Sequence, residues 1–276
     1  MSTLQNRKSL IRRGEPITLC GLVFYPIMMS DYELFNACKG ALIIRQSSLP
    51  VRYISLDYIQ ALFAMDMDAA NDPEGHIPGI FARALTFLAT SLRIEADRFF
   101  RECEIFQEST PDGRSPLLSR IRINQNGDPV ELTSAELSTL IRPLICQQNG
   151  LEIPDESENL DIIRSFDELK AVQGQGRKGL KVDIDDLIAF VSYKSGCTPP
   201  DIDRWTVKQF EERRRAIERD RYHLVYALGE LSGLVKFEKG NPVPSMFFDA
   251  LDDRLGTASL ESVGKNIPGT GMKGPR

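Results

Sequence analysis

The stretch with the strongest chemical signal is Asp66–His76, DMDAANDPEGH, which gathers carboxylates beside one of the two histidines of the chain. Oxygen ligands at alternate positions are typical of a calcium loop, which also needs a glycine at its sixth position and a glutamate at its twelfth. Counted from Asp66, these positions hold Asn71 and Ile77. The spacing therefore predicts a polar loop between helices and no metal ligands.

Two glycine-rich stretches suggest phosphate binding. A phosphate loop needs a preceding strand and a following helix, whose N–H groups converge on the anion. Only two residues follow Gly269–Gly274, GTGMKG, so we expect no phosphate site there. The basic stretch Gly174–Lys181, GQGRKGLK, is flanked by acidic residues such as Asp167 and Asp183, and it is more typical of a linker.

Other catalytic groups are scattered or badly oriented. The five cysteines include no Cys-x-x-Cys pair, which argues against a zinc cluster or a disulfide framework: Cys20, Cys38, Cys103, Cys146 and Cys197. The adjacent carboxylates of Asp185 and Asp186 face different directions on a helix, and His223 is expected to be a packed or surface residue. We therefore predict no catalytic residue, no cofactor and no metal, and hence no enzyme.

Composition indicates a globular protein with an ordinary core. The chain has 276 residues, of which 42% are hydrophobic and 26% charged, so wholesale disorder is excluded and roughly two domains are expected. A net charge of -5 makes nucleic acid an improbable partner, although the basic run Asn6–Arg13, NRKSLIRR, offers local positive charge. That run is more typical of a solvated or self-paired terminus.

Targeting signals are not recognisable. Lys8, Arg12 and Arg13 interrupt the early apolar residues, which argues against a signal peptide, and no apolar run reaches the roughly 18 residues of a membrane span. The expected location is the cytoplasm, with reduced cysteines.

Hydrophobic periodicity predicts a mainly α-helical fold with minor β structure and bundle-like helical domains. Short β-hairpins are expected near residues 16–27 and 120–133, the second around Asn126-Gly127. Helices are expected over Ser30–Gln46, Ser55–Ala70, Gly79–Ile94, Ala135–Gly150, Glu156–Val172 and Asp183–Tyr193. Ser30 with Glu33, and Thr133 with Glu136, have the spacing of capping boxes, and Pro143 should kink or divide its helix.

These elements suggest a division of the chain into consecutive regions. We expect an N-terminal hairpin with a helical unit over residues 1–95, a middle hairpin-helix region over 96–172 and a linker over 173–181. A C-terminal helical region is expected over 182–255, and a disordered tail over 256–276.

The longest predicted helix covers Thr206–Val235 and begins with a third capping box, Thr206 with Gln209. Two rows of residues repeat every seven positions along it. One row is apolar throughout, and the other changes from arginine to apolar: Phe210, Ile217, Leu224 and Leu231 in the first, Arg214, Arg221, Leu228 and Val235 in the second. The C-terminal half therefore has the wider apolar stripe.

Two interpretations of this helix remain open. In the first, it is a surface helix anchored at its C-terminal end, with pairs such as Arg214 and Glu218 supporting the exposed half. In the second, its arginine-rich half contacts another helix, in a second copy or in a different protein. The candidate partner-binding residues are Phe210, Arg214, Ile217 and Arg221.

Three segments together resemble uncharacterised proteins of tailed phages and prophages of Gram-positive bacteria. They are GEPITLCGLVFYPIMMSDYELFNACKGALIIRQSSLP, STLIRPLICQQNGLEIPDESEN and WTVKQFEERRRAIERDRYHLVYALGELSGLVKF. The resemblance covers about the first 250 residues, rests on the order and texture of segments, and is to tail assembly chaperones. It implies a helical protein of the host bacterial cytoplasm that binds the tape measure protein, itself, or both, before the tail tube polymerises.

Two other functions remain as alternatives. One is a structural component of the virion, in the tail or baseplate. The other is a DNA-binding or regulatory phage protein that uses the basic terminus and the arginines of the long helix, and this function would make DNA affinity depend on salt.

Overall fold

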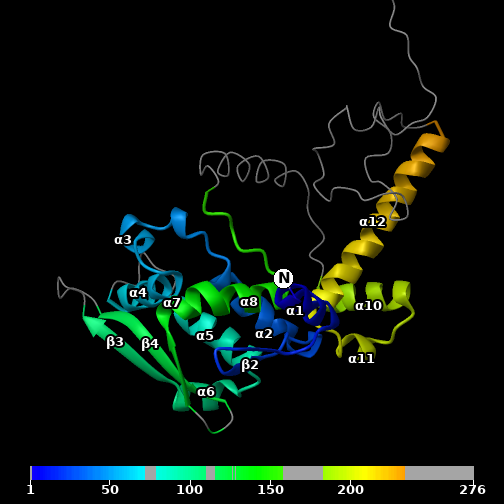
Figure 1. Ribbon diagram of the computed structural model, residues 1–276. Helices are drawn as coiled ribbons and strands as arrows, with labels where there is room; N and C mark the ends of the chain where they lie inside the picture. The colour runs from blue at the N-terminus through cyan, green and yellow to red at the C-terminus, as the bar shows by residue number, and fades with distance from the viewer. Residues whose placement is uncertain are drawn as a thin grey trace, which may run out of the picture. The chain divides into compact units, whose positions relative to one another are not determined.

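A computed structural model describes residues 2–71, 79–109, 116–125, 127, 129–157 and 183–233. The chain divides into two compact units, Met1–Arg213 and Arg214–Arg276. The first unit combines many short helices with two small antiparallel sheets, so the predicted mainly α-helical class with minor β structure is confirmed (Figure 1). The predicted helix 156–172, linker 173–181 and tail 256–276 lie wholly or almost wholly outside the described residues.

The first hairpin forms where the sequence predicts it. Strands β1 (Ile17–Leu19) and β2 (Leu22–Phe24) pair antiparallel. The two residues between them, Cys20 and Gly21, both have positive φ, 49° and 79°, which is the requirement of a tight type I′ turn. Leu22 and Phe24 are fully buried, so the hairpin contributes one face to the core.

Helices account for most of the remaining N-terminal half. In order they are α1 (Ser2–Arg13), η1 (Met29–Asp31), α2 (Tyr32–Cys38), η2 (Lys39–Leu42), η3 (Gln46–Ser48), α3 (Val51–Ile54), α4 (Tyr58–Asn71), α5 (Ile80–Ser91) and α6 (Ala96–Glu102). The predicted capping box of Ser30 and Glu33 is wrong. A 3-10 turn precedes α2 there, and no side chain caps either element.

The carboxylates that suggested a metal loop have structural partners. Asp66, on α4, accepts hydrogen bonds from the backbone N–H groups of Ile80 (2.7 Å) and Phe81 (2.9 Å), and so caps the first turn of α5. Asp68 accepts one from the hydroxyl of Tyr53 at 2.7 Å. Among the described residues, no three His, Cys, Asp or Glu side chains lie together as metal ligands would.

The second sheet has three strands where the sequence predicted a two-stranded hairpin. Strands β3 (Glu104–Ser109), β4 (Pro116–Asn124) and β5 (Pro129–Thr133) are antiparallel in that order. The β4–β5 hairpin confirms the prediction over 120–133, whereas β3 was missed. Four apolar side chains of β4 and β5 are fully buried: Leu118, Ile121, Ile123 and Leu132.

The outer face of this sheet carries a cluster of two arginines and two glutamates, in which Arg120 lies 3.5 Å from Glu131. Arg122 bridges two glutamates, Glu104 on β3 at 2.7 Å and Glu131 on β5 at 2.6 Å, and lies over the ring of Phe106. The pairing of β3 shifts register between Phe106 and Gln107, which marks a bulge.

Near Pro143, where the sequence predicted a kink or a division, the helix changes from a π-helical turn to an α-helix. After the α7 turn (Ser134–Glu136), where Thr133 and Glu136 form the predicted capping box, the chain makes a π-helical turn η5 (Leu137–Ile141) and continues as α8 (Arg142–Gln148). Pro143 lies in the first turn of α8, directly after the π-helical turn.

The segment after α8 returns to the N-terminal half. The carboxylate of Glu156 accepts hydrogen bonds from the backbone N–H groups of Gln46 (2.9 Å) and Ser47 (2.8 Å), and Arg45 donates to the carbonyl of Asp155. Burial opposes ionisation of Glu156, but the hydrogen bonds from Ser47 and Gln46 and the charge of Arg45 outweigh it and lower its pKa.

This docked carboxylate should make stability depend on pH. Since the pKa of Glu156 is lower in the folded protein, its contribution is present above the unfolded value of about 4.3 and is lost as pH falls through the folded value. We expect Glu156→Gln to reduce the free energy of unfolding at pH 7, and the difference from the unmodified chain to shrink towards pH 3. Denaturant titrations of both proteins across this range would measure it. A difference that is constant over the whole range would contradict the assignment.

Candidate protein-binding site on helix α12

The C-terminal part of the described chain contains α10 (Ile184–Ser195), α11 (Pro199–Ile202) and the 25-residue helix α12 (Val207–Leu231). The predicted capping box of α12 is confirmed. The backbone N–H of Gln209 donates to the hydroxyl of Thr206 at 3.1 Å, and that of Thr206 donates to the side-chain oxygen of Gln209 at 3.0 Å. The helix therefore begins where the sequence places it.

Long-range hydrogen bonds hold this first turn of α12. The backbone N–H of Val207 donates to the carbonyl of Ile27, and the N–H of Met29 donates to the carbonyl of Trp205, each at 2.9 Å. Ile27 is itself held by Asn149, whose buried amide oxygen accepts from the N–H of Ile27 at 2.8 Å. The start of α12 is thus attached to the loop after β2.

Two glycines allow α12 to approach this closely. A Cβ atom at Gly14 would lie 2.9 Å from Cγ2 of Thr206, and one at Gly150 would lie 3.3 Å from Cγ of Lys208. Both glycines also have positive φ, 73° and 70°. A larger residue at either position would therefore push against the start of α12 and strain the backbone.

The prediction that α12 is anchored by its C-terminal half is wrong. Val207 and Phe210 are fully buried, whereas Leu224, Leu228 and Leu231 are 54%, 64% and 84% exposed. The prediction that Phe210 contacts a partner is also wrong, because its side chain belongs to the core of the first unit. For Arg214, Ile217 and Arg221, partner binding stays a prediction.

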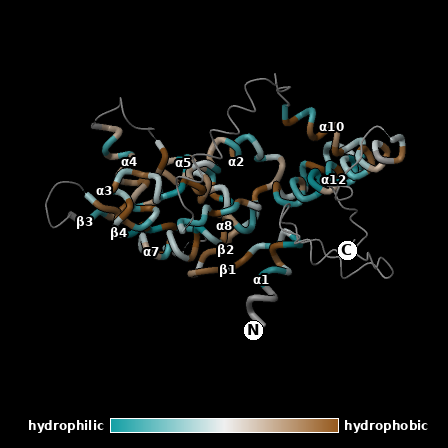
Figure 2. Tube along the Cα trace, turned by 90° about the horizontal axis from the view of Figure 1, so that it is seen from above, coloured by the Kyte–Doolittle hydropathy of each residue, from teal (hydrophilic) through white to brown (hydrophobic). Residues whose placement is uncertain are grey.

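The exposed part of the heptad rows forms one surface, which we call the α12 seam. Its members alternate at spacings of three and four residues: Arg214, Ile217, Arg221, Leu224, Leu228 and Leu231. This is the a/d pattern by which one helix packs along another. It spans roughly 25 Å of helix at 1.5 Å per residue. Figure 2 shows hydrophobic residues interleaved with hydrophilic ones along α12.

The two arginines of the seam differ in their surroundings. Arg214 is half-buried and forms the predicted ion pair with Glu218, with 2.6 Å between Nη1 and Oε1. Arg221 is exposed, and no ion pair involving it is found among the described residues. The seam therefore presents three leucines and one guanidinium towards solvent.

A second surface feature lies beside the start of α12. A hollow of about 390 Å³ is lined by Trp205, Gln209, Glu212 and Arg213, and the guanidinium of Arg213 stacks on the indole at 4.5 Å. The lining therefore offers an indole, an amide, a carboxylate and a guanidinium as recognition groups.

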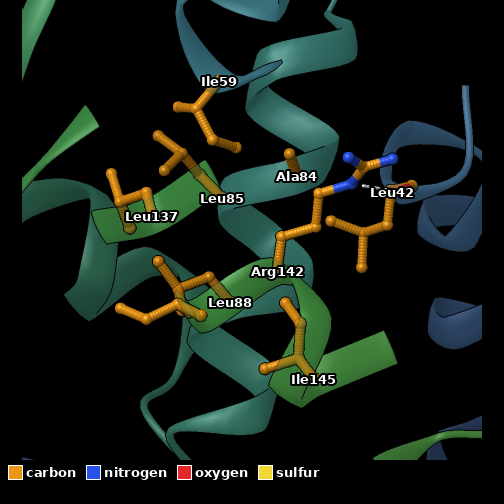
Figure 3. A pocket seen from close by; sticks show the side chains of 9 residues that line it. Leu42, Ile59, Ala84, Leu85, Leu88, Leu137, Arg142 and Ile145 are labelled. Carbon is orange, nitrogen blue, oxygen red and sulfur yellow. Dashed lines mark hydrogen bonds between the residues drawn. The ribbon is translucent and has the colours of Figure 1, made fainter. Parts of the chain in front are cut away.

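The most unusual buried group is Arg142, which the sequence analysis missed. Its Nε donates to the carbonyl of Leu42 at 2.9 Å, and its guanidinium lies 3.3 Å from the ring centroid of Tyr58. Figure 3 shows the Arg142 side chain among the mostly aliphatic residues that line a cavity of about 20 Å³, with its guanidinium directed towards Leu42.

Burial changes the ionisation of both groups in this stack. It lowers the pKa of Arg142 and raises the pKa of Tyr58 to about 12. Tyr58 is therefore neutral at physiological pH. The stack ties α8 to α4 and η2 and makes no acid-base pair near pH 7.

Burial also raises the pKa of two thiols well above the usual value. It raises the pKa of Cys103 and of Cys146 to about 11. A thiol acts as a nucleophile in its ionised form, so these two cysteines are poor nucleophiles at neutral pH.

No helix in the described part of the chain has the length and apolar character needed to cross a membrane. Comparisons of the chain with protein-family models, with curated proteins and with solved structures found no match. The resemblance to tail assembly chaperones stays a prediction.

Proposed function

We propose that this protein is a non-enzymatic assembly factor that binds an α-helical partner along the α12 seam. The observation that carries the proposal is the exposure of Leu224, Leu228 and Leu231 on one face of α12, in a heptad pattern. Apolar side chains in this arrangement are typical of surfaces that receive another helix.

The energy available from the seam suits a reversible complex. Leu224, Leu228 and Leu231 are 54%, 64% and 84% exposed, so burying what remains of them contributes roughly 3 to 6 kcal/mol, and association itself costs on the order of 4 to 15 kcal/mol. The net free energy of binding is therefore small unless neighbouring side chains add further contacts. A modest affinity is what an assembly factor requires if it binds a partner transiently and then leaves.

The partner that the resemblance implies is the tape measure protein of a tailed phage, a long helical protein with abundant apolar surface. On this proposal the protein coats the tape measure protein in the host bacterial cytoplasm and leaves before the virion matures. The exposed leucines of α12 support a helical partner of this kind.

Co-expression tests the proposal directly. We expect a tape measure protein of a tailed phage to become more soluble, and to co-purify, when this protein is present. Loss of co-purification at every salt concentration tried would contradict the proposal. Mass spectrometry of purified particles gives a second readout, because an assembly factor should be missing from the virion and a structural component should be present at fixed stoichiometry.

A further inference from the structure

The α12 seam contains a positive charge at a position that a partner would cover. Arg221 lies between Ile217 and Leu224 in the heptad pattern, so a helix packed on the leucines also covers its guanidinium. Covering a charge is costly unless a countercharge meets it. We propose that the partner helix carries a carboxylate that faces Arg221, within an apolar a/d pattern. The inference rests on the proposed function and specifies the chemistry of its partner.

Within the described part of the chain, the carboxylates near Arg221 in sequence are poorly placed to supply this countercharge. Glu218, three residues earlier, is paired with Arg214 at 2.6 Å. Asp220 is exposed and adjacent in sequence, and residues i and i+1 on a helix do not face each other. A guanidinium presents a planar fork of N–H donors that matches a carboxylate, which makes Glu or Asp of the partner the fitting group.

The same arginine disfavours a second copy of this chain as the partner. In a parallel pair of α12 helices, Arg221 would face Arg221 and Arg214 would face Arg214 within the seam, because equivalent heptad positions meet. In an antiparallel pair, the arginines would face apolar positions and remain without a countercharge. Like charges and unpaired charges in an interface select against a partner. The seam therefore favours a different, acidic helix.

A pair of synthetic peptides tests the inference. Both contain three heptads with leucine at every a and d position and differ only in the central heptad, where the positions flanking the leucines are glutamate in one peptide and lysine in the other. We expect the full-length protein to bind the glutamate peptide about tenfold more tightly. Fluorescence anisotropy would measure both affinities.

Reversing the charge at position 221 tests whether Arg221 causes the preference for the glutamate peptide. Arg221→Glu should invert the preference, so that the lysine peptide binds more tightly. Arg215→Glu makes the same charge change at an exposed position of α12 outside the seam and should leave the preference unchanged. For the unmodified protein, the difference in affinity between the two peptides should also decrease in 1 M salt, where the screening length falls to about 3 Å.

The possible failures are distinguishable. Equal affinities of the unmodified protein for both peptides would overturn the acidic-partner inference while leaving seam binding intact. No binding of either peptide by the unmodified protein or by Arg221→Glu would count against the proposed function as well. A stable dimer of the unmodified protein in sedimentation, abolished by a change in the seam, would overturn the inference in favour of a second copy.

Discussion

Replacing Leu224 and Leu228 together by aspartate is expected to abolish binding of a helical partner to α12. Each leucine offers an exposed side chain that a partner would bury, and each substitution would place a carboxylate in the apolar part of the seam. Covering an unpaired charge removes several kcal/mol of binding energy, which exceeds the small surplus expected for this complex. Co-purification with the tape measure protein, or anisotropy with the acidic peptide, would measure the loss.

A matched control separates this effect from a general loss of solubility or folding. Val51 is 84% exposed on α3, far in sequence from the seam, and Val51→Asp makes a comparable change there. It should leave binding unchanged. Because Leu224 and Leu228 are exposed, the double variant should also retain the circular dichroism and unfolding transition of the unmodified chain. Binding that survives in the double variant would show that the seam is not the partner site.

Phe210→Ala is expected to produce the largest loss of stability among substitutions in α12. The side chain is fully buried, and truncating a buried phenylalanine costs about 3 to 5 kcal/mol through lost transfer energy and the remaining cavity. Such a loss is a large fraction of the stability of an ordinary domain. Denaturant unfolding followed by circular dichroism would measure the change in the free energy of unfolding.

Leu228→Ala is the natural comparison, because it truncates an apolar residue of the same helix. Its side chain is 64% exposed, so we expect a change within about 0.5 kcal/mol. If the two substitutions destabilised the protein equally, the C-terminal half of α12 would be packed in a core, and the seam would not be available to a partner.

Local signals predicted several elements correctly. Gly127 has a positive φ of 103° in the turn between β4 and β5, as the Asn-Gly pair indicated. The reciprocal hydrogen bonds of Thr133 with Glu136, and of Thr206 with Gln209, also follow from short spacings in the sequence. These features were predictable because every group involved lies within a few residues of the others.

Features set by distant residues were not predictable in this way. The apolar stripe is wider in the C-terminal half of α12, so hydrophobicity alone placed the anchor there. The anchor lies instead at Val207, whose backbone N–H bonds to Ile27, 180 positions earlier in the chain. The stack of Arg142 on Tyr58 was missed for the same reason. Sequence periodicity shows which face of a helix is apolar but not which part of that face is covered.

The heptad rows named four candidate partner-binding residues. For Arg214, Ile217 and Arg221 partner binding stays a prediction, whereas Phe210 belongs to the core. The exposed leucines of the seam were taken for buried residues. The prediction for Asp66–His76 depends on spacing alone, and part of that stretch lies outside the described residues. The capping role of Asp66 depends on the position of α5, which the spacing does not show.

The irregular outer strand of the three-stranded sheet has a consequence for the behaviour of the protein in concentrated solution. Among the described strands, β3 is at an edge, where unpaired backbone groups could recruit a strand from a neighbouring molecule. The bulge at Phe106 and the charges of Glu104 and Glu108 interrupt the flat, uncharged template that fibril growth requires. We infer that the bulge and the charges of β3 disfavour amyloid-like pairing of this edge with another molecule.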